Sequence, residues 1–281
     1  MQFIVVLIQF SVIFGVLASG MTTAPADLSY VLKQPSRLAR ALLVLCVISP
    51  IVTVMVCRSF SLHPAVIVGL VTLSVAPVGA LFAAAMMPLV APGNAAYARG
   101  LLFASAMLSV VLTPLGVQVI ATIYGDDVRV PPLAVARVVL TSVFLPLGIG
   151  LWLGNRWPAT RRWIPSIQKI SGLVLTGCLI AIVVLGWSRI GLVLRGGTIT
   201  AIAIVTLVIL AIGHLIGGPE SDDRTVLAFA AVSRHPGVAL TVASFTQQEL
   251  AAVGVMLAFL ISTLAAVPYK RWRQRLRSTA G

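Results

Sequence analysis

The chain is poor in acidic residues and in charge of any kind. Only 7 of its 281 residues are Asp or Glu, and charged residues make up 10% of the sequence. A soluble domain carries about 25% charged residues, so this chain has too few to cover a water-facing surface. Because 59% of its residues are hydrophobic, we expect an integral membrane protein.

Cysteine and histidine are also scarce, with three of each. Cys46, Cys57 and Cys178 all lie in apolar runs, which excludes a disulfide framework and gives no spacing typical of metal ligands. The apolar segments hold no paired carboxylates and no Ser/His/Asp set, which argues against an enzyme. We therefore expect no catalytic residue, no cofactor and no metal site.

Long hydrophobic runs are what the sequence has instead. Nine segments approach or exceed the roughly 20 residues that a membrane helix needs, and they are apolar on all sides. These predicted spans are residues 3–20, 39–57, 64–90, 100–123, 132–154, 167–187, 198–217, 225–246 and 249–268. We thus expect an all-α polytopic protein, with one integral membrane domain over residues 1–281 and a basic tail at 269–281. The first segment has no basic start, so we interpret it as a retained span; a signal peptide cleaved near Ser19 and Gly20 is the alternative.

The distribution of positive charge predicts the orientation. Fourteen of the 20 Lys and Arg residues fall in loops on one side of the nine spans and four on the other. By the positive-inside rule, the N-terminus is expected outside and the C-terminus in the cytoplasm. This rule explains the net charge of +13 without a nucleic-acid partner. The composition is typical of a bacterial inner-membrane protein, whose partner is the lipid bilayer.

Two predicted spans carry a helix break near their middle, at residues 76–79 and at residues 234–237. The break sequences are Ala-Pro-Val-Gly and Arg-His-Pro-Gly. Proline removes a backbone donor and glycine loosens a helix, so both spans should be interrupted within the membrane. A pair of such interruptions in corresponding positions of two halves marks the central site of secondary transporters. Pro77, Gly79, Pro236 and Gly237 are therefore candidate site residues.

The two breaks suggest an internal repeat. Each is in the third span of a group of four, and the predicted topology makes the groups inverted relative to each other. The first repeat would cover residues 1–123 and the second residues 132–268, with the span at 132–154 left without a partner. The second repeat would then hold one helix more than the first.

Short motifs along nearly the whole chain resemble those of the bile acid:sodium symporter family. Phe14–Met21 followed by Pro25–Leu28 resembles that family's "FGxGL" helix end and "P-x-D-F" continuation. Further similar motifs, in the family's order, are Lys33-Gln34-Pro35, Pro50, Pro77-Val78-Gly79, Gly93-Asn94 and Leu112-Thr113-Pro114. The resemblance implies a ten-helix inverted-repeat fold with a panel domain, a core domain and two discontinuous helices that cross in the core. This chain would lack the family's first helix.

The chain departs from the family where sodium would bind. The resemblance implies two sodium ions held by a "PGGxxSN" and an "ExGxQN" segment. At the Ser and Asn positions of the first segment this chain has Phe82 and Ala83, and at the Glu, Gln and Asn positions of the second it has Ala230, Arg234 and His235. Sodium needs hard oxygen ligands, and a guanidinium does not deprotonate. We therefore expect no sodium sites.

Arg234 is the leading candidate for a functional residue, because an arginine within a span is expensive and rarely lacks a role. It would replace a bound cation or hold an anionic substrate; the alternative is that it only binds carbonyls freed at the break. His235 is a candidate carrier of a coupled proton, or else a neutral histidine bonded at the break.

Small polar residues near the breaks complete the candidate site. Ser105, Ser109 and Thr113 are spaced to share one helix face, and Ser233 adjoins the second break. Such residues also serve as packing contacts between membrane helices, so both interpretations stay open.

The function predicted is a secondary transporter or facilitator that moves a small organic anion by alternating access, without sodium and with proton coupling open. One alternative is a carrier of another class of substrate, such as a metalloid anion or a sodium-coupled bile-acid-like solute. The other is a membrane sensor or scaffold that keeps the fold and does not transport.

Overall fold

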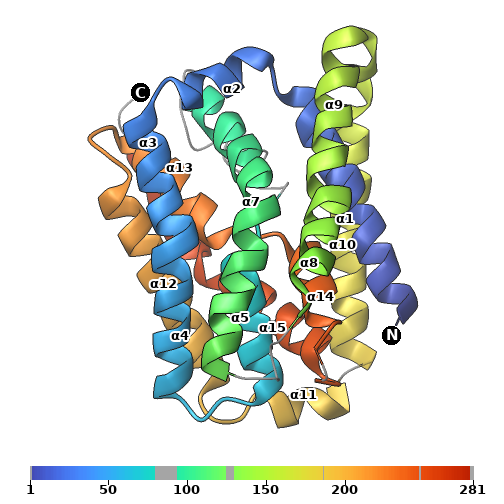
Figure 1. The fold of residues 1–281 in the computed structure, drawn as a ribbon, viewed down its shortest axis with the longest axis vertical. Helices are drawn as coiled ribbons and strands as arrows, with labels where there is room; N and C mark the ends of the chain where they lie inside the picture. Colours follow the sequence, from blue (N-terminus) through green and yellow to red (C-terminus); the bar gives the residue numbers. More distant parts are fainter. Residues whose placement is uncertain (1, 80–93, 125–129, 186, 247, 279–281) are drawn as a thin grey trace.

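Most helices of the computed structural model run along one common axis (Figure 1). The structure describes residues 2–79, 94–124, 130–185, 187–246 and 248–278. Within these ranges the chain is helical throughout, apart from connecting turns and one isolated β-bridge. The first half contains α1 (Gln2–Thr22), α2 (Pro25–Leu32), α3 (Pro35–Leu42), the π-helical turn η1 (Leu43–Ile48), α4 (Ser49–Ser59), α5 (Pro64–Val75) and α7 (Ala95–Tyr124). The second half contains α8 (Pro132–Val139), η5 (Leu140–Phe144), α9 (Leu145–Arg156), η6 (Pro158–Trp163), α10 (Ile164–Leu185), α11 (Trp187–Val193), α12 (Thr198–Ile216), α13 (Ser221–Val232), α14 (Pro236–Ala243), α15 (Ala251–Ala265) and α16 (Val267–Ser278).

The predicted membrane spans correspond to these helices. In the described part of the chain, six helices are long and apolar enough to cross a membrane, and the pair α1 and α2, bent by 88°, makes a seventh if counted as one span. The described part of the predicted span at 64–90 contains the short helix α5, and the predicted span at 225–246 appears as the two short helices α13 and α14. An all-helical membrane protein is therefore confirmed, while the inverted repeat of nine spans stays a prediction.

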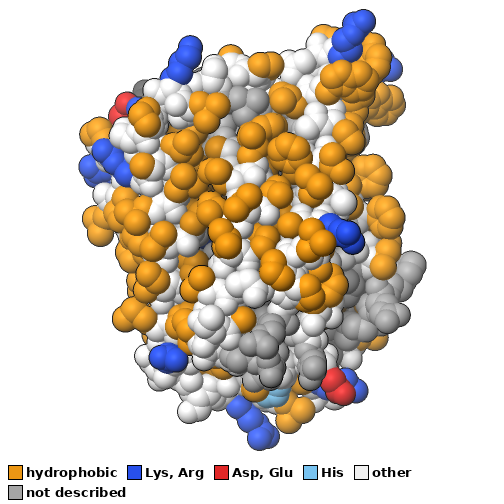
Figure 2. Space-filling view, viewed as in Figure 1, with side chains coloured by type: hydrophobic (Ala, Val, Ile, Leu, Met, Phe, Trp, Pro, Cys, Tyr) orange, Lys and Arg blue, Asp and Glu red, His pale blue; other side chains and the backbone are white. Residues whose placement is uncertain are grey.

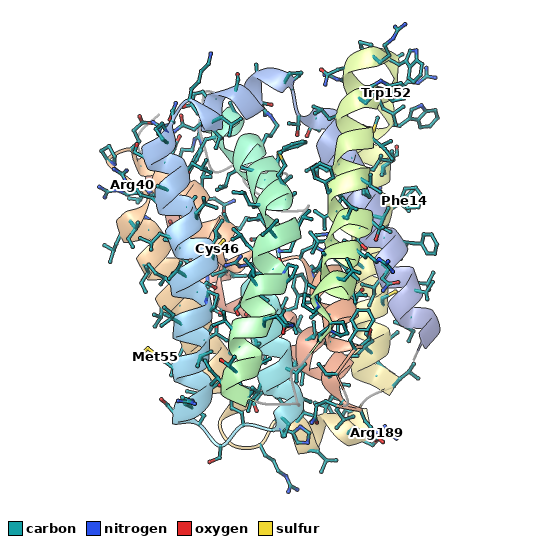
Figure 3. All side chains as sticks on the ribbon, viewed as in Figure 1. Phe14, Arg40, Cys46, Met55, Trp152 and Arg189 are labelled. Atoms are coloured by element: carbon teal, nitrogen blue, oxygen red, sulfur yellow. The ribbon has the colours of Figure 1, made fainter. Side chains whose placement is uncertain are left out.

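The outer surface is suited to lipid. Large apolar side chains point outward along the helices; Phe14 is 50% and Met55 63% exposed, and both lie at the edge of the molecule in Figure 3. Figure 2 shows a mostly hydrophobic face with most Lys and Arg side chains toward its two ends. Arg40 lies toward one end and Arg189 near the other (Figure 3). This distribution matches a bilayer core between two charged interfaces.

The helices form two groups. In one, α1 packs against α9 and α10, and in the other α5 packs against α15 and α12 against α13. The contact between α5 and α15 brings backbone against backbone, because a Cβ atom placed on Gly254 would lie 1.8 Å from the carbonyl oxygen of Ala65. Small residues allow membrane helices to approach this closely. A rigid contact thus holds α5, which leads to the first break, against α15.

A helix ends at each of the two predicted breaks, and the structure describes the helix that follows the second one. Helix α5 ends at Val75, where Ala76 turns to an extended conformation, and α13 ends at Val232 before α14 begins at Pro236. Proline is tolerated at the first position of a helix, where its missing N–H needs no partner, so Pro236 restarts the second broken helix. The segment after Gly79, including Phe82 and Ala83, lies outside the described residues.

Candidate functional site

The two breaks meet and pair their backbones. Val78 and Arg234 form an antiparallel β-bridge, in which the Gly79 N–H donates to the Ser233 carbonyl at 2.6 Å and the His235 N–H donates to the Pro77 carbonyl at 2.9 Å. A Cβ atom on Gly79 would lie 3.0 Å from the Arg234 carbonyl oxygen, so glycine permits this approach. The pairing satisfies backbone groups that the breaks remove from their helices.

The Arg234 side chain binds three carbonyl groups from three segments. Its Nε donates to Ala231 at 2.9 Å, Nη1 to Ala76 at 3.0 Å and Nη2 to Leu45 at 2.8 Å. Arg234 is 7% exposed, and the described residues place no carboxylate against it. Among the described residues, this buried positive charge is thus stabilised by carbonyl dipoles, in the way that carbonyl ligands stabilise a bound metal cation.

Two of these acceptors, Ala231 and Leu45, are free for a local reason. The Ala231 carbonyl lacks its helical partner because the His235 N–H bonds to Pro77. In the π-helical turn, the Ser49 N–H donates to Val44, and the next position is Pro50, which has no N–H. The Leu45 carbonyl therefore has no donor in its own helix and accepts from Arg234. π-helical turns of this kind occur often at functional sites.

His235 caps the restarted helix. It is fully buried, and its Nδ1 accepts from the Val238 N–H at 3.2 Å. An acceptor at Nδ1 places the proton of a neutral ring on Nε2, which has no hydrogen-bond partner among the described residues. The geometry therefore gives His235 a role at the start of α14, and its proton coupling stays a prediction.

The serine and threonine candidates on α7 line a small separate cavity. Ser105, Ser109, Thr113 and Pro77 border a space of about 30 Å³ together with Arg234. Ser105 and Ser109 donate to carbonyls of their own helix, whereas Thr113 donates to the Val75 carbonyl at 2.8 Å and so caps the end of α5. Here Thr113 connects α7 to the first break.

A larger cavity of about 270 Å³ also borders the paired breaks, which we call the crossing. It is bordered by Gly79, Ser233, Arg234, His235 and Pro236 from the breaks. Its other walls come from α1, α10, α13, α15 and the start of α16, through residues that include Ser11, Ser171, Phe229, Phe259, Ser262, Thr263 and Lys270. The cavity therefore lies between the two helix groups and is mostly apolar, and Arg234 and Lys270 are the charged residues on its described border.

Comparison with known proteins identifies the family. The model of the Sodium Bile acid symporter family matches residues 9–191, which is more than half of the chain. The chain belongs to the sodium bile acid symporter family. A search of the curated proteins gave no match. Members of this family are transporters, so the chain is a membrane protein of a transporter family and the resemblance inferred from its motifs is confirmed.

The matched region ends before the second break. Within residues 9–191 lie the π-helical turn, the first break and α7, while Arg234 lies beyond it. Of the departures from the family's sodium ligands, Arg234 thus stands in the unmatched part, whereas Phe82 and Ala83 lie within the matched region.

Sequence reasoning found some members of the site and missed others. Of the ten predicted site residues, Arg234 borders both cavities, while Gly237 lies within α14 and borders neither. The Leu45 carbonyl was missed. Pro50, five residues later, could have indicated it, because proline has no N–H to donate to that carbonyl in a π-helical turn. Lys270 was missed because it was counted only as part of a basic tail.

Proposed function

We propose that the chain moves a small organic anion across the membrane by alternating access and without sodium, and that Arg234 takes the place of a bound cation. The observation that carries this proposal is the guanidinium held by the carbonyls of Ala231, Ala76 and Leu45 at the crossing of the two breaks. Family membership supports the transporter function. The buried arginine supports an anionic substrate and transport without sodium.

A fixed guanidinium at the crossing opposes sodium in two ways. It uses the freed carbonyls that would be ligands for the ion, and its charge repels a second cation in a site of low dielectric constant. Every Asp and Glu of the chain lies in a loop or at the end of a predicted span, so none is placed near the middle of a span to compensate that charge. A sodium ion could therefore bind these carbonyls only if the Arg234 side chain moved away from them.

The same charge favours an anionic solute. Arg234 and Lys270 border the 270 Å³ cavity, and the described residues of its lining include no carboxylate. At about 270 Å³ the cavity is slightly below the roughly 300–1,000 Å³ of sites for drug-sized molecules, which suits a small solute, and its apolar walls suit the carbon skeleton of an organic anion. Its position between the two helix groups suits a movement of one group against the other.

Uptake into proteoliposomes tests the proposal. We expect labelled taurocholate or a small carboxylate to enter at the same initial rate with external sodium as with external choline. Liposomes without protein give the background, and a sodium gradient of either direction should change nothing. Uptake that rises severalfold with sodium would contradict the proposed role of Arg234, and a complete lack of uptake across the panel would contradict the carrier function.

Lys270 should contribute to anion affinity. It is half-buried at the cavity wall, where a charge-assisted hydrogen bond to an anion is worth about 1.5–3 kcal/mol. We expect Lys270→Ala to raise the apparent KM for the transported anion about tenfold with the amount of folded protein unchanged. Lys169→Ala is the matched control, because Lys169 is exposed on α10 and does not border the cavity. An unchanged KM in Lys270→Ala would exclude this contribution.

A further inference from the structure

A network of charges joins the N-terminal turn of α13 to neighbouring helices. Four of the seven acids of the chain, Asp27, Glu220, Asp222 and Asp223, lie at this end of the molecule within ion-pair distance of an arginine. Asp27 pairs with Arg99 of α7 and Asp222 with Arg273 of α16. The other two acids share one partner, Arg37 of α3.

Arg37 of α3 contacts three other helices. Its Nη1 donates to the Tyr30 hydroxyl of α2 at 2.7 Å, its Nη2 donates to Glu220 at 2.8 Å, and its Nε lies 3.0 Å from Asp223 Oδ2. Its guanidinium also stands 5.8 Å from the centre of the Tyr97 ring. The side chain therefore links α2, α3 and α7 to the start of α13.

Asp223 is the unusual member of this network. It is fully buried, and neither of its carboxylate oxygens has a hydrogen bond among the described residues. Its contact with Arg37 is an ion pair through one oxygen only. A buried carboxylate normally accepts several hydrogen bonds, and a buried one without them favours its protonated form.

The charges around Asp223 only partly offset its burial. Burial raises its pKa to about 6; Arg37 and Arg40 act against this rise, while Glu220 and Asp222 add to it. Two nearby arginines have other partners: Arg224 of α13 binds the Gly218 carbonyl, and Arg273 of α16 binds the Ser221 carbonyl and pairs with Asp222. Tyr30 and Tyr97 are further titratable groups around Arg37. Asp223 precedes the predicted span at 225–246, so water can reach it when this turn moves.

We propose that Asp223 is a proton-binding site that holds α13 in the position seen here: a proton from water binds its carboxylate while the turn is buried and returns to water when the turn moves outward. Arg37 keeps its charge and its bond to Glu220 throughout. Binding and conformation are linked, since a proton favours whichever arrangement binds it more tightly. Protonation of Asp223 thus stabilises the buried arrangement.

The position of Asp223 connects this proton to the crossing. α13 is a rigid helix of 12 residues, or about 18 Å at 1.5 Å per residue. Asp223 lies in its first turn, and the Ala231 carbonyl that binds Arg234 lies in its last turn. A movement of the buried turn therefore moves the helix end that holds Arg234. The consequence for transport, though not the proton binding itself, rests on the proposed function.

Thermal unfolding of the purified protein without substrate tests the proton site. Because the pKa of folded Asp223 lies above its unfolded value near 4, the folded state binds more protons between pH 4 and 6. Linkage then predicts that stability falls as pH rises through this window. We expect the melting temperature of the wild type to fall by a few degrees from pH 4.5 to 6.5, and this fall to be reduced much more in Asp223→Asn than in the matched variant Asp222→Asn, which removes only a neighbouring charge that adds to the rise in the Asp223 pKa.

An equal fall in Asp223→Asn and wild type would overturn the proposal. If Asp223→Asn does not fold, infrared difference spectra of the wild type between pH 4.5 and 7 decide: a band of a buried protonated carboxyl that is lost on raising the pH supports the site, and its absence overturns it. A reduced fall in Asp223→Asn together with no uptake of any anion would leave the proton site standing and remove the carrier function, so the two failures are distinguishable.

Discussion

Replacing Arg234 by methionine should abolish uptake and lower the melting temperature. Methionine has a similar length but no donor, so three buried carbonyls lose their partner. Each unsatisfied buried group costs about 1–3 kcal/mol, and the charge that we propose for anion transport is lost as well. We expect at least a tenfold fall in the initial rate of uptake per folded protein, measured in proteoliposomes after size-exclusion chromatography.

Two further variants separate the contributions of charge and hydrogen bonding. Arg234→Lys keeps the positive charge, but a single ammonium does not reproduce the planar fork that reaches three carbonyls, so we expect an intermediate rate and stability. Arg137→Ala is the matched control, because Arg137 also lies within a predicted span but is exposed. Wild-type uptake by Arg234→Met would show that the arginine has no part in transport.

The second large effect is expected at Gly254. An added methyl group would lie 1.8 Å from the Ala65 carbonyl oxygen and 2.5 Å from its carbon, far inside contact distance. Because these are backbone atoms, a rotamer change cannot relieve the overlap, and α5 and α15 must separate. We expect Gly254→Ala to yield little or no monodisperse protein, as measured by fluorescence-detected size-exclusion chromatography and thermal unfolding.

A glycine without such a neighbour provides the comparison. Gly172 lies in α10, and a Cβ atom there would meet no atom within 4 Å. Gly172→Ala should therefore fold like the wild type. If Gly254→Ala also gives the wild-type elution profile and melting temperature, α5 and α15 do not pack as closely as described here.

The fold was largely predictable because the sequence is dominated by one physical signal. Apolar runs long enough for a bilayer predict helices, and the proline and glycine residues at 76–79 and 236–237 predict where two of them break. What hydropathy does not encode is the bend between α1 and α2 or the π-helical turns. These depend on how neighbouring helices pack and on which backbone donors are absent.

The candidate site was predictable for side chains and not for backbone groups. Arg234 is conspicuous because charge within a span is rare, but its partners are carbonyls, which every residue has. Only their unsatisfied state distinguishes them, and that state depends on pairing between segments far apart in the chain. The two cavities were likewise beyond prediction, because Lys270 and Ser11 meet only through tertiary packing.

The missing N–H of Pro50 makes the side chain at position 234 depend on a residue far away in the chain. A donor at position 50 would compete for the Leu45 carbonyl, and loss of the arginine at 234 would leave that carbonyl buried without a partner. Neither change is neutral alone, although 184 positions separate them. Because a proline at position 50 is also one of the motifs that resemble the family's, we expect Pro50 in members with and without the arginine, whereas an arginine at 234 is expected only where this proline leaves the Leu45 carbonyl free.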